Sequence, residues 1–342
     1  MADPDVLIVG AGLAGLVAAR ELVTAGATVR LLDKGRRPGG RLATRRIGSA
    51  TLDHGAQFFT VRSDAFASLT GQWQQAGARI QRWSRGFAQA DDVRDGPAGV
   101  TSSAGDGHPR YVVDGGMNAL PAHLADGLDV VSNARAVAAW VREGRWHVAT
   151  HGGGGPVVHR APRLVCACPI PQALALVARG DTVLPDDAAG ALGSVTYEPC
   201  LALLAVLDRT AAGLPRPGGV QFASGPVRWM ADNGRKPVSQ TSAVTVHASG
   251  GWSRAWFDAG EEDIVVALAA WLRPWIAPAT IVDRQVMRWR YSQPHDLLDQ
   301  RLLTTMVDGV PLHFAGDAFV HARVEGAALS GLAVANTVLG LR

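Results

Sequence analysis

The first 33 residues hold the pattern that most constrains the fold of this chain. Val6–Val9 is a short apolar run, typical of a buried parallel strand, and it leads directly into Gly10-Ala-Gly-Leu-Ala-Gly15. Helix-forming residues with helical spacing follow over 16–23, and a second apolar run, Val29–Leu32, ends at Asp33. Strand, glycine-rich turn, helix, strand and acidic residue in this order predict a βαβ unit that binds a dinucleotide.

Each glycine of this turn has a physical task. Gly10 allows a tight turn, Gly12 lets a pyrophosphate approach the backbone, and Gly15 lets the helix pack closely on the strand. The N-terminus of the helix offers free N–H groups and the positive end of its dipole to the phosphates. The Asp33 carboxylate can accept hydrogen bonds from ribose hydroxyls and would repel the 2′-phosphate of NADP. These residues leave NAD and FAD open.

Two further segments favour FAD. Pro38-Gly-Gly-Arg41 has paired glycines that let a loop lie against a flat ligand, and its arginine can offset pyrophosphate charge; Asp53-His-Gly-Ala-Gln-Phe58 follows. Near the other end, a strand over 312–315 runs into Gly316-Asp317, and a helix of small residues begins at Val324, where its dipole can favour negative charge on a reduced flavin. The three segments together resemble the FAD-binding pattern shared by amine oxidases, p-hydroxybenzoate hydroxylase-type enzymes and their relatives.

We expect FAD to be bound without a covalent link, because no cysteine or histidine attachment motif is visible. No metal site is predicted, since Cys166-x-Cys168 has neither the spacing nor the partner pair of a zinc site. The residues that we expect to bind FAD are Gly10, Gly12, Leu13, Ala14, Gly15, Asp33, Lys34, Gly40, Arg41, His54, Gly55, Ala56, Gln57, Phe58, Val137, Gly316, Asp317, Val324, Glu325, Gly326 and Ala327.

The length of 342 residues suggests about two domains. Because both ends of the chain contribute to the expected FAD site, the first domain must be discontinuous. The predicted fold is α/β (α+β), with a Rossmann-like FAD-binding domain and a mostly antiparallel substrate domain. The FAD-binding domain is expected to comprise residues 1–61, 104–172 and 284–342, and the substrate domain residues 62–103 and 173–283.

The interior of the chain supports this division. Strand-like runs over 200–208, 221–223, 227–231 and 243–247, with an amphipathic helix over 261–272, predict the sheet of the substrate domain and a helix beside it. Residues 130–137 and 146–150 read as two strands of one hairpin, with Gly144 near its turn. Residues 90–109, rich in Gly, Asp and Ser, are predicted to be a mobile loop.

Composition excludes several classes of partner. The net charge is +3, lysine occurs only at positions 34 and 236, and the arginines are scattered, so a nucleic-acid surface is not indicated. No secretory signal is visible, and no stretch approaches the ~18 consecutive apolar residues of a membrane helix. Three cysteines fit a reducing compartment. We expect a cytoplasmic monomer or homodimer without nucleic-acid or membrane partners.

A finer resemblance, to the bacterial branch of the renalase family, spans nearly the whole chain. It rests on Asp33-Lys34 with Pro38-Gly-Gly-Arg41, on Asp53-His-Gly-Ala-Gln-Phe58, on Tyr197-Glu-Pro-Cys200, and on Arg288-Trp-Arg-Tyr-Ser-Gln-Pro294. The resemblance implies a p-hydroxybenzoate hydroxylase-like fold and an oxidase acting on 2- or 6-dihydro-NAD(P). It implies hydride transfer to flavin N5, release of NAD(P)+ and reoxidation by O2 to give H2O2.

The residues themselves fit this reaction. A dihydropyridine is already a hydride donor, so its oxidation needs orientation and exclusion of water rather than a side-chain base. Amine oxidases usually place a lysine near flavin N5. Here Lys34 belongs to the adenosine end and Lys236 to a polar Asn-Gly-Arg-Lys-Pro loop, so neither is expected to serve.

The expected wall of the substrate site contains His247, Trp289, Tyr291 and Tyr197, with Arg290 beside them. His247 could hydrogen-bond a carboxamide as a neutral imidazole, or be a structural histidine at a strand end. Trp289 and Tyr291 alternate on a strand and share one face, which is either pocket or core. The remaining tryptophans are interpreted as packing residues.

Three other functions stay open at this point. The first is a flavin amine oxidase or dehydrogenase acting on a small metabolite. The second is a flavin hydroxylase, which would use NAD(P)H to reduce the flavin before O2 is activated. The third is a redox-state binding module with little turnover, which the completeness of the expected site disfavours.

Overall fold

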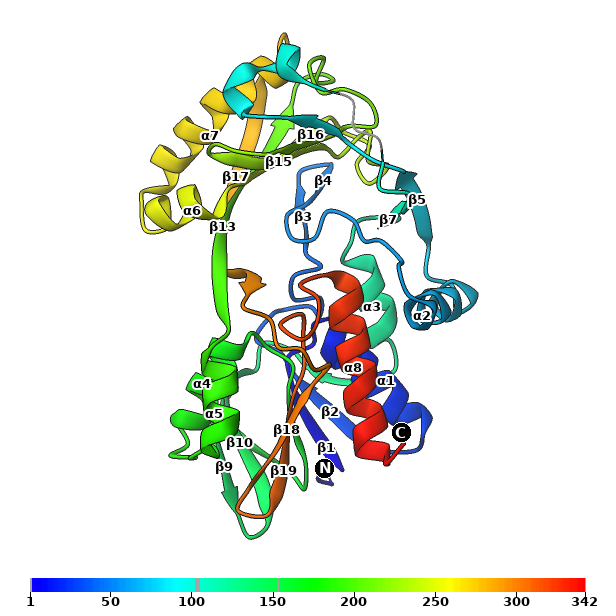
Figure 1. The fold of residues 1–342 in the computed structure, drawn as a ribbon, viewed down its shortest axis with the longest axis vertical. Coiled ribbons are helices and arrows are strands. Elements are labelled where there is room, and N and C mark those ends of the chain that lie inside the picture. The colour runs from blue at the N-terminus through cyan, green and yellow to red at the C-terminus, as the bar shows by residue number, and fades with distance from the viewer. Residues whose placement is uncertain (1, 102–104, 153, 342) are drawn as a thin grey trace. The chain divides into compact units, whose positions relative to one another are not determined.

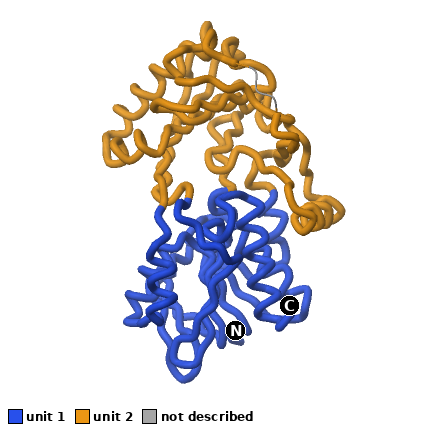
Figure 2. The backbone as a smooth tube through the Cα atoms, viewed as in Figure 1, with its two compact units in different colours: residues 1–41, 120–196, 294–342 blue, residues 42–119, 197–293 orange. Residues whose placement is uncertain are grey.

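The computed structural model describes residues 2–101, 105–152 and 154–341 (Figure 1). Contacts divide the chain into two compact units (Figure 2). Unit 1 comprises residues 1–41, 120–196 and 294–342, and unit 2 comprises residues 42–119 and 197–293. Residues 42–61 therefore pack within unit 2, although the sequence assigns them to FAD binding. The predicted limits of the FAD-binding domain and of the substrate domain stay a prediction.

Unit 1 is built on a six-stranded sheet in the order β18-β19-β12-β1-β2-β8. All neighbouring strands are parallel except β18 and β19. The strands are β1 (Val6–Val9), β2 (Val29–Leu32), β8 (Asp129–Val131), β12 (Leu164–Cys166), β18 (Leu303–Val307) and β19 (Val310–Phe314). Strand β1 is fully buried because it has a parallel neighbour on each side and apolar side chains throughout.

Two helices from opposite ends of the chain lie side by side in unit 1: α1 (Leu13–Thr24) and α8 (Val324–Leu339) (Figure 1). Their close approach depends on a small residue, since a Cβ added at Gly331 would lie 2.2 Å from the carbonyl oxygen of Ala14. Arg20 ties α1 to α3 (Ala119–Ala125) by donating from Nε to the carbonyl oxygen of Leu124 over 2.7 Å. The small-residue pattern of α8 thus allows helix packing as well as an approach to a ligand.

The hairpin expected at 130–150 differs in the structure. Val130 pairs with Leu31, so β8 is an edge strand of the parallel sheet. The antiparallel strands begin at Arg135 instead and number three, because a further strand follows the expected pair. They are β9 (Arg135–Arg142), β10 (Arg145–Gly152) and β11 (Gly155–Ala161), and helices α4 (Ile170–Ala178) and α5 (Asp186–Gly193) follow β12. The sequence interpretation assigned Val130 and Val131 to the hairpin. It could not place them correctly, because the residues of a short apolar strand do not show which strand it pairs with.

Unit 2 contains a second six-stranded sheet in the order β17-β13-β16-β15-β14-β6. Its strands are β6 (Ala88–Ala90), β13 (Thr196–Leu207), β14 (Gly219–Phe222), β15 (Val227–Asp232), β16 (Ala243–Ala248) and β17 (Ile281–His295). The pairs β13/β16, β15/β16 and β14/β15 are antiparallel, whereas β14 and β6 are parallel. Five of these strands, β13 to β17, lie where the sequence predicts strands.

The two faces of this sheet have different neighbours. Helix α7 (Glu261–Ile276) places Ile264, Leu268 and Leu272 in one buried cluster with the sheet. A separate cluster joins Leu204 and the sheet to the hairpin of β3 (Thr44–Ile47) and β4 (Ala50–Asp53). The hairpin thereby brings the end of β4 to the sheet.

The remaining elements of unit 2 are α2 (Asp64–Gln75), β5 (Ile80–Ser84), β7 (Arg110–Val113), α6 (Gly250–Trp256) and two 3₁₀ turns at Val93–Asp95 and Pro97–Gly99. The 3₁₀ turns give part of the expected 90–109 loop a regular form, and residues 102–104 lie outside the described residues. No helix in the described part of the chain is long and apolar enough to cross a membrane.

Candidate functional site

The glycine-rich turn of unit 1 is formed by close backbone packing. A Cβ added at Gly15 would lie 2.1 Å from the carbonyl oxygen of Gly10, so a larger residue there would push α1 away from the turn. Apart from Gly12 itself and its two chain neighbours, no described residue has an atom within 4 Å of a Cβ built at Gly12, which leaves the start of α1 open to a phosphate group. Asp33 accepts from the backbone N–H of Ala11 over 2.7 Å and of Gly35 over 2.6 Å, which fixes its carboxylate beside the turn.

The paired glycines at 39–40 lie against this turn. Gly40 has a φ of +54°, and a Cβ added to it would lie 3.2 Å from Gly12 Cα. The N–H of Gly39 donates to the carbonyl oxygen of Ala11 over 2.9 Å. The two glycine segments therefore form one surface that a flat anionic ligand can approach.

Arg41 and Asp317 join the two ends of the predicted FAD motif. The guanidinium donates from Nη1 and Nη2 to the two carboxylate oxygens over 2.7 and 2.6 Å, in a bidentate pair. The N–H of Gly316 donates to the Ser330 hydroxyl over 2.9 Å, which ties the Gly-Asp turn to α8. The sequence predicts Arg41 as a partner of the pyrophosphate, which stays a prediction; the partner that the structure shows is the Asp317 carboxylate.

The other predicted FAD residues of unit 1 are placed around these. Val324, Glu325, Gly326 and Ala327 form the first turn of α8, Lys34 is exposed just after β2, and Val137 is half-buried on β9. The open helix start, the Asp33 carboxylate and the packed glycines fit the phosphate and ribose groups of a dinucleotide. The remaining predicted FAD residues, 54–58, belong to unit 2.

Unit 2 contains a fully buried ion pair at the end of β4. Lys236 Nζ lies 2.6 Å from Asp53 Oδ2, and neither side chain is exposed. The other carboxylate oxygen of Asp53 accepts from the Thr44 hydroxyl and from the N–H of Met117. Burial lowers the pKa of Lys236, and the charge of Asp53 opposes that shift.

The burial of Lys236 departs from the sequence interpretation, which placed it in a polar loop. The loop folds back because the Asp232 carboxylate accepts from the N–H groups of Gly234 and Arg235 over 2.9 and 3.1 Å. This turn directs the lysine inward, where Asp53 supplies the charge that makes its burial tolerable. The sequence shows Asp53 as the first residue of a motif, but nothing in the residues around Asp53 or Lys236 indicates that these two side chains, 183 positions apart, form an ion pair.

The 53–57 segment is joined to β16 by polar contacts. Thr245 donates its hydroxyl to the carbonyl oxygen of Asp53 over 2.9 Å, and Gln57 Nε2 donates to the same oxygen over 2.7 Å. Gln57 also lies 3.4 Å from His247 Nε2 and, through Oε1, 3.5 Å from Lys236 Nζ. Burial lowers the pKa of His247 to about 3, and the charges of His54 and Lys236 act in the same direction.

Trp289 meets the same segment from β17. Its ring stacks on His54 with centroids 5.3 Å apart and planes at 24°, and its Nε1 donates to the carbonyl oxygen of His54 over 2.9 Å. Burial lowers the pKa of His54 to about 4, against the opposing charge of Asp53. The structure thus brings the predicted residues His54, Gln57, His247 and Trp289 together.

The other predicted wall residues lie apart from this group. Tyr291 packs edge-on against Tyr197, with centroids 5.6 Å apart. Arg290 lies over the ring of Phe257, on the opposite face of β17 from Trp289 and Tyr291, because successive strand side chains alternate. Arg290 therefore does not join the cluster.

A cluster of aromatic side chains continues the site beyond Lys236. Phe58, Trp83, Phe87 and Trp229 contact one another with centroids 4.6 to 6.5 Å apart. Lys236 Nζ lies 5.6 Å from the centroid of the Trp83 ring. Sequence reasoning missed Trp83 and Trp229 because a tryptophan in a strand carries no mark that separates packing from binding.

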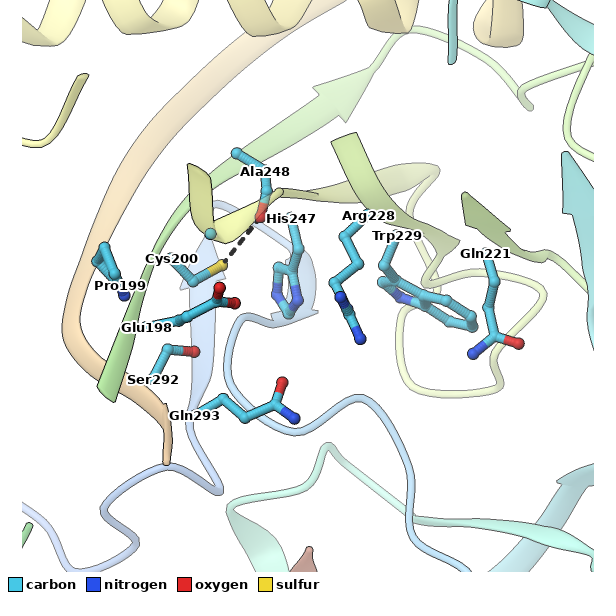
Figure 3. Close-up of a pocket in the computed structure, with 11 residues that line it drawn as sticks. Glu198, Pro199, Cys200, Gln221, Arg228, Trp229, His247, Ala248, Ser292 and Gln293 are labelled. Atoms are coloured by element: carbon cyan, nitrogen blue, oxygen red, sulfur yellow. Dashed lines mark hydrogen bonds between the residues drawn. The ribbon is translucent and has the colours of Figure 1, made fainter. Parts of the chain in front are cut away.

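The same sheet holds a cavity of about 170 Å³, shown in Figure 3. Its lining includes Glu198, Cys200, Gln221, Arg228, Trp229 and His247. His247 is the predicted catalytic residue that lines it, and Glu198 belongs to the Tyr197-Glu-Pro-Cys200 motif. The described residues contain no group of three His, Cys, Asp or Glu side chains placed to hold a metal ion.

Comparison with known proteins gives two family matches. Residues 8–71 match a family described as an NAD(P)-binding Rossmann-like domain, and residues 76–339 match one described as flavin containing amine oxidoreductase. Curated relatives match over short segments. Lysine-specific histone demethylase 1 homolog 1 from Arabidopsis thaliana is 57% identical over 44 residues, which is 13% of this chain and 5% of that protein.

Putrescine oxidase from Kocuria rosea is 48% identical over 58 residues, which is 17% of this chain and 12% of that protein. A solved structure of wild-type putrescine oxidase bound to putrescine covers 99% of both chains with a TM-score of 0.73 and 18% identity. Identity this low shows the fold alone. The predicted fold class, a Rossmann-like domain with a sheet-rich second domain, is confirmed.

Proposed function

The chain belongs to the flavin-containing amine oxidoreductase family and is an FAD-dependent oxidoreductase, and from this premise we propose which reaction it catalyses. The proposed substrates are the 2- and 6-dihydro isomers of NAD(P)H, which are oxidised to NAD(P)+. When bound, FAD supplies the N5 atom that accepts the hydride and passes the electrons to O2, giving H2O2.

The observation that carries this proposal is that, in the described part of unit 2, the group formed by His54, Gln57, His247 and Trp289 has no side chain suited to accept a proton. His247 and His54, with pKa values near 3 and 4, are neutral at pH 7 but too weakly basic to take a proton. The Asp53 carboxylate lies 2.6 Å from Lys236 Nζ and holds that ammonium in an ion pair. A dihydropyridine loses only a hydride and leaves an aromatic cation, so its oxidation requires none of these groups to act as a base.

The described side chains would act by holding and shielding the substrate. Trp289 stacked on His54 gives a rigid flat wall, since its indole N–H is fixed by the His54 carbonyl. Gln57 and His247 add neutral polar groups beside it. We propose that the glycine turn, Asp33 and the Arg41–Asp317 pair hold FAD non-covalently. A cytoplasmic location and a monomeric or dimeric state are part of the same proposal.

One observation favours a second candidate, a flavin amine oxidase. Glu198 lines the cavity of unit 2, and a carboxylate there could hold the ammonium group of an amine. Putrescine oxidase, matched over 58 residues, is named for such a substrate. The two candidates differ in what the site must accommodate: a neutral dihydropyridine ring or a cationic amine.

Rapid anaerobic mixing of the purified flavoprotein separates them. The probes are 2-dihydro-NAD, 6-dihydro-NAD, ordinary NADH and an amine panel that includes putrescine, with flavin absorbance as the readout. We expect fast bleaching by the two isomers and slow or no bleaching by NADH and amines. Bleaching by amines alone overturns the proposal in favour of the amine oxidase, and fast bleaching by NADH in the presence of an aromatic effector favours a hydroxylase.

A further inference from the structure

Arg228 is an exposed cation at the wall of the cavity in unit 2. Its guanidinium makes no hydrogen bond and no ion pair with any residue that the structure describes. Arg41 and Arg284, by contrast, each pair with a carboxylate, over 2.6 and 2.8 Å. An exposed arginine without a partner is ordinary on an open surface, but this one lines a cavity. Its donors are therefore available to a ligand that enters there.

A register shift in β15 accounts for the position of Arg228. On one side of it, Val227 pairs with Ala248 of β16. On the other side, Trp229 pairs with His247, so Arg228 is an extra residue between the two pairs. Successive side chains of a regular strand point to opposite faces, yet Arg228 and Trp229 both line the cavity. A bulge that redirects one side chain in this way is typical of strands beside functional sites.

The charge of Arg228 acts on groups inside the cavity. Burial raises the pKa of the Cys200 thiol, which also lines the cavity, to about 12. A hydrogen bond with Ser292 and the positive charge of Arg228 oppose that shift. His247 adds no positive charge at pH 7, because burial lowers its pKa to about 3. Arg228 is therefore the only cation among the described residues that line the cavity.

The carboxylate of the cavity wall, that of Glu198, is held apart from Arg228. It packs against the start of α6, where a Cβ added at Gly250 would lie 2.3 Å from the carboxyl carbon of Glu198. In Figure 3 the Glu198 carboxylate and the Arg228 guanidinium lie on either side of the His247 ring. In the described structure the two charges form no ion pair, so Glu198 leaves the donors of Arg228 unoccupied.

The size of the cavity limits what can enter it. Its volume of about 170 Å³ is below the ~300 Å³ at which pockets enclose a whole drug-sized ligand. A ring-sized portion of a nucleotide fits, and the rest of the molecule must stay outside. Because Arg228 both lines the cavity and is exposed, it lies where such a molecule leaves the cavity.

We propose that Arg228 binds a phosphate group of the substrate and thereby selects nicotinamide compounds that carry one. A guanidinium offers a planar fork of N–H donors that matches phosphate oxygens, and the hydrogen bonds are charge-assisted. The inference rests on the proposed function, because the proposed substrates carry a phosphate group on the ribose that is attached to the nicotinamide ring.

Isothermal titration calorimetry of the FAD-loaded enzyme with nicotinamide riboside and nicotinamide mononucleotide tests this role. The two compounds differ by one phosphate group, and neither donates a hydride, so their binding is independent of the proposed reaction. We expect the mononucleotide to bind about tenfold more tightly than the riboside, the effect of one charge-assisted hydrogen bond. Arg228→Gln should remove this difference, and Arg228→Lys should retain part of it. Arg273→Gln changes an exposed arginine of α7 that does not line the cavity; it is the matched control and should change neither affinity.

A wild type that does not prefer the mononucleotide, or a preference that survives in Arg228→Gln, overturns the proposal. Benzoate serves as the carboxylate probe, and its tighter, Arg228-dependent binding overturns phosphate as the ligand. Arg228 is exposed, so its replacement should leave the fold intact, and Arg228→Lys tests the proposal even if Arg228→Gln does not fold.

The same variants separate this inference from the proposed function. An Arg228-dependent preference for the mononucleotide without oxidation of dihydro isomers refutes the proposed function alone. Oxidation of dihydro isomers with a preference that does not depend on Arg228 refutes the role of Arg228 alone.

Discussion

Lys236 Nζ lies 2.6 Å from Asp53 Oδ2 with both side chains removed from solvent, so one of only two lysines in the chain neutralises a carboxylate inside unit 2. The pair joins the turn after β15 to the end of β4, at the 53–57 segment, which also contacts His247 through Gln57 and Trp289 through His54. Its position makes the ion pair a support for the candidate site as well as for the fold.

Removing the lysine should be costly. Lys236→Met leaves the buried Asp53 carboxylate without its counter-charge, and we expect a loss of about 3–5 kcal/mol in the free energy of unfolding. Adding Asp53→Asn should recover part of this loss, because the double variant has no buried charge. Urea denaturation of FAD-loaded protein measures both. Arg301→Met removes an exposed cation far from the expected FAD residues in sequence; it is the control and should change stability by less than about 0.5 kcal/mol.

Two histidines of the candidate site, His54 and His247, predict how stability depends on pH. Their pKa values in the folded protein, about 4 for His54 and about 3 for His247, lie below the ordinary value of 6.5. The unfolded chain therefore binds these protons first as pH falls, and stability present above pH 6.5 is lost progressively towards pH 4. Each histidine should contribute a slope of up to about 1.4 kcal/mol per pH unit in this window.

Urea denaturation between pH 7.5 and pH 4.5 checks this dependence. The expected result is a steep decline in the wild type and a shallower one in His54→Gln, with the exposed His151→Gln as the control. If the free energy of unfolding changes equally with pH in the wild type and in His54→Gln, the dependence does not come from His54.

The glycine turn predicts a loss of cofactor on a one-carbon change. Gly15→Ala places a methyl group 2.1 Å from the Gly10 carbonyl oxygen, so α1 must move away from the turn that it closes. We expect the FAD content of purified protein, measured as flavin absorbance per polypeptide, to fall by at least half. Gly71→Ala, within α2 and with no described atom near its added Cβ, should retain full FAD. Full FAD content in Gly15→Ala would show that FAD binding does not require the close packing of α1 against the Gly10 turn.

Because Arg41 and Asp317 form a bidentate pair, we predict that a positive charge at position 41 is not enough to retain FAD. Lysine cannot reproduce the two parallel hydrogen bonds of 2.7 and 2.6 Å, so Arg41→Lys should separate the N-terminal loop from the Gly-Asp turn. We expect FAD to dissociate about tenfold more readily, as measured by fluorescence of released flavin. Arg30→Lys changes another Arg–Asp pair of unit 1, with Asp129, and should leave FAD release unchanged. Equal release from both variants would contradict the special role of Arg41.

Much of unit 1 could be predicted because its signals are local. Strands β1 and β2 begin and end where the apolar runs do, and the glycine spacing identifies the turn between them. In unit 2, strand positions were predictable from residue type, but the pairing of Gln221, Trp229 and His247 depends on register between strands far apart in sequence. The burial of Lys236 likewise depends on a distant carboxylate. The sequence singled out His247 and Trp289, both of which contact the 53–57 segment, but the cavity that His247 lines could be found only from the structure.

Glu198 gives the sharpest separation of the two candidate functions. Its carboxylate lines the same cavity as Arg228 and His247, where it can hold a cationic substrate or balance the arginine. Glu198→Gln keeps the shape and removes the charge. If dihydro-NAD(P) isomers are the substrates, the variant should oxidise them with kcat/KM within about threefold of wild type, because a neutral ring gains little from one carboxylate. If amines are the substrates, KM for putrescine should rise by about a hundredfold, since the charge-assisted bond to the ammonium group is lost. Steady-state H2O2 formation with both substrate classes measures the difference, and a large KM effect on the dihydro isomers would contradict the proposal that the site takes a neutral dihydropyridine ring.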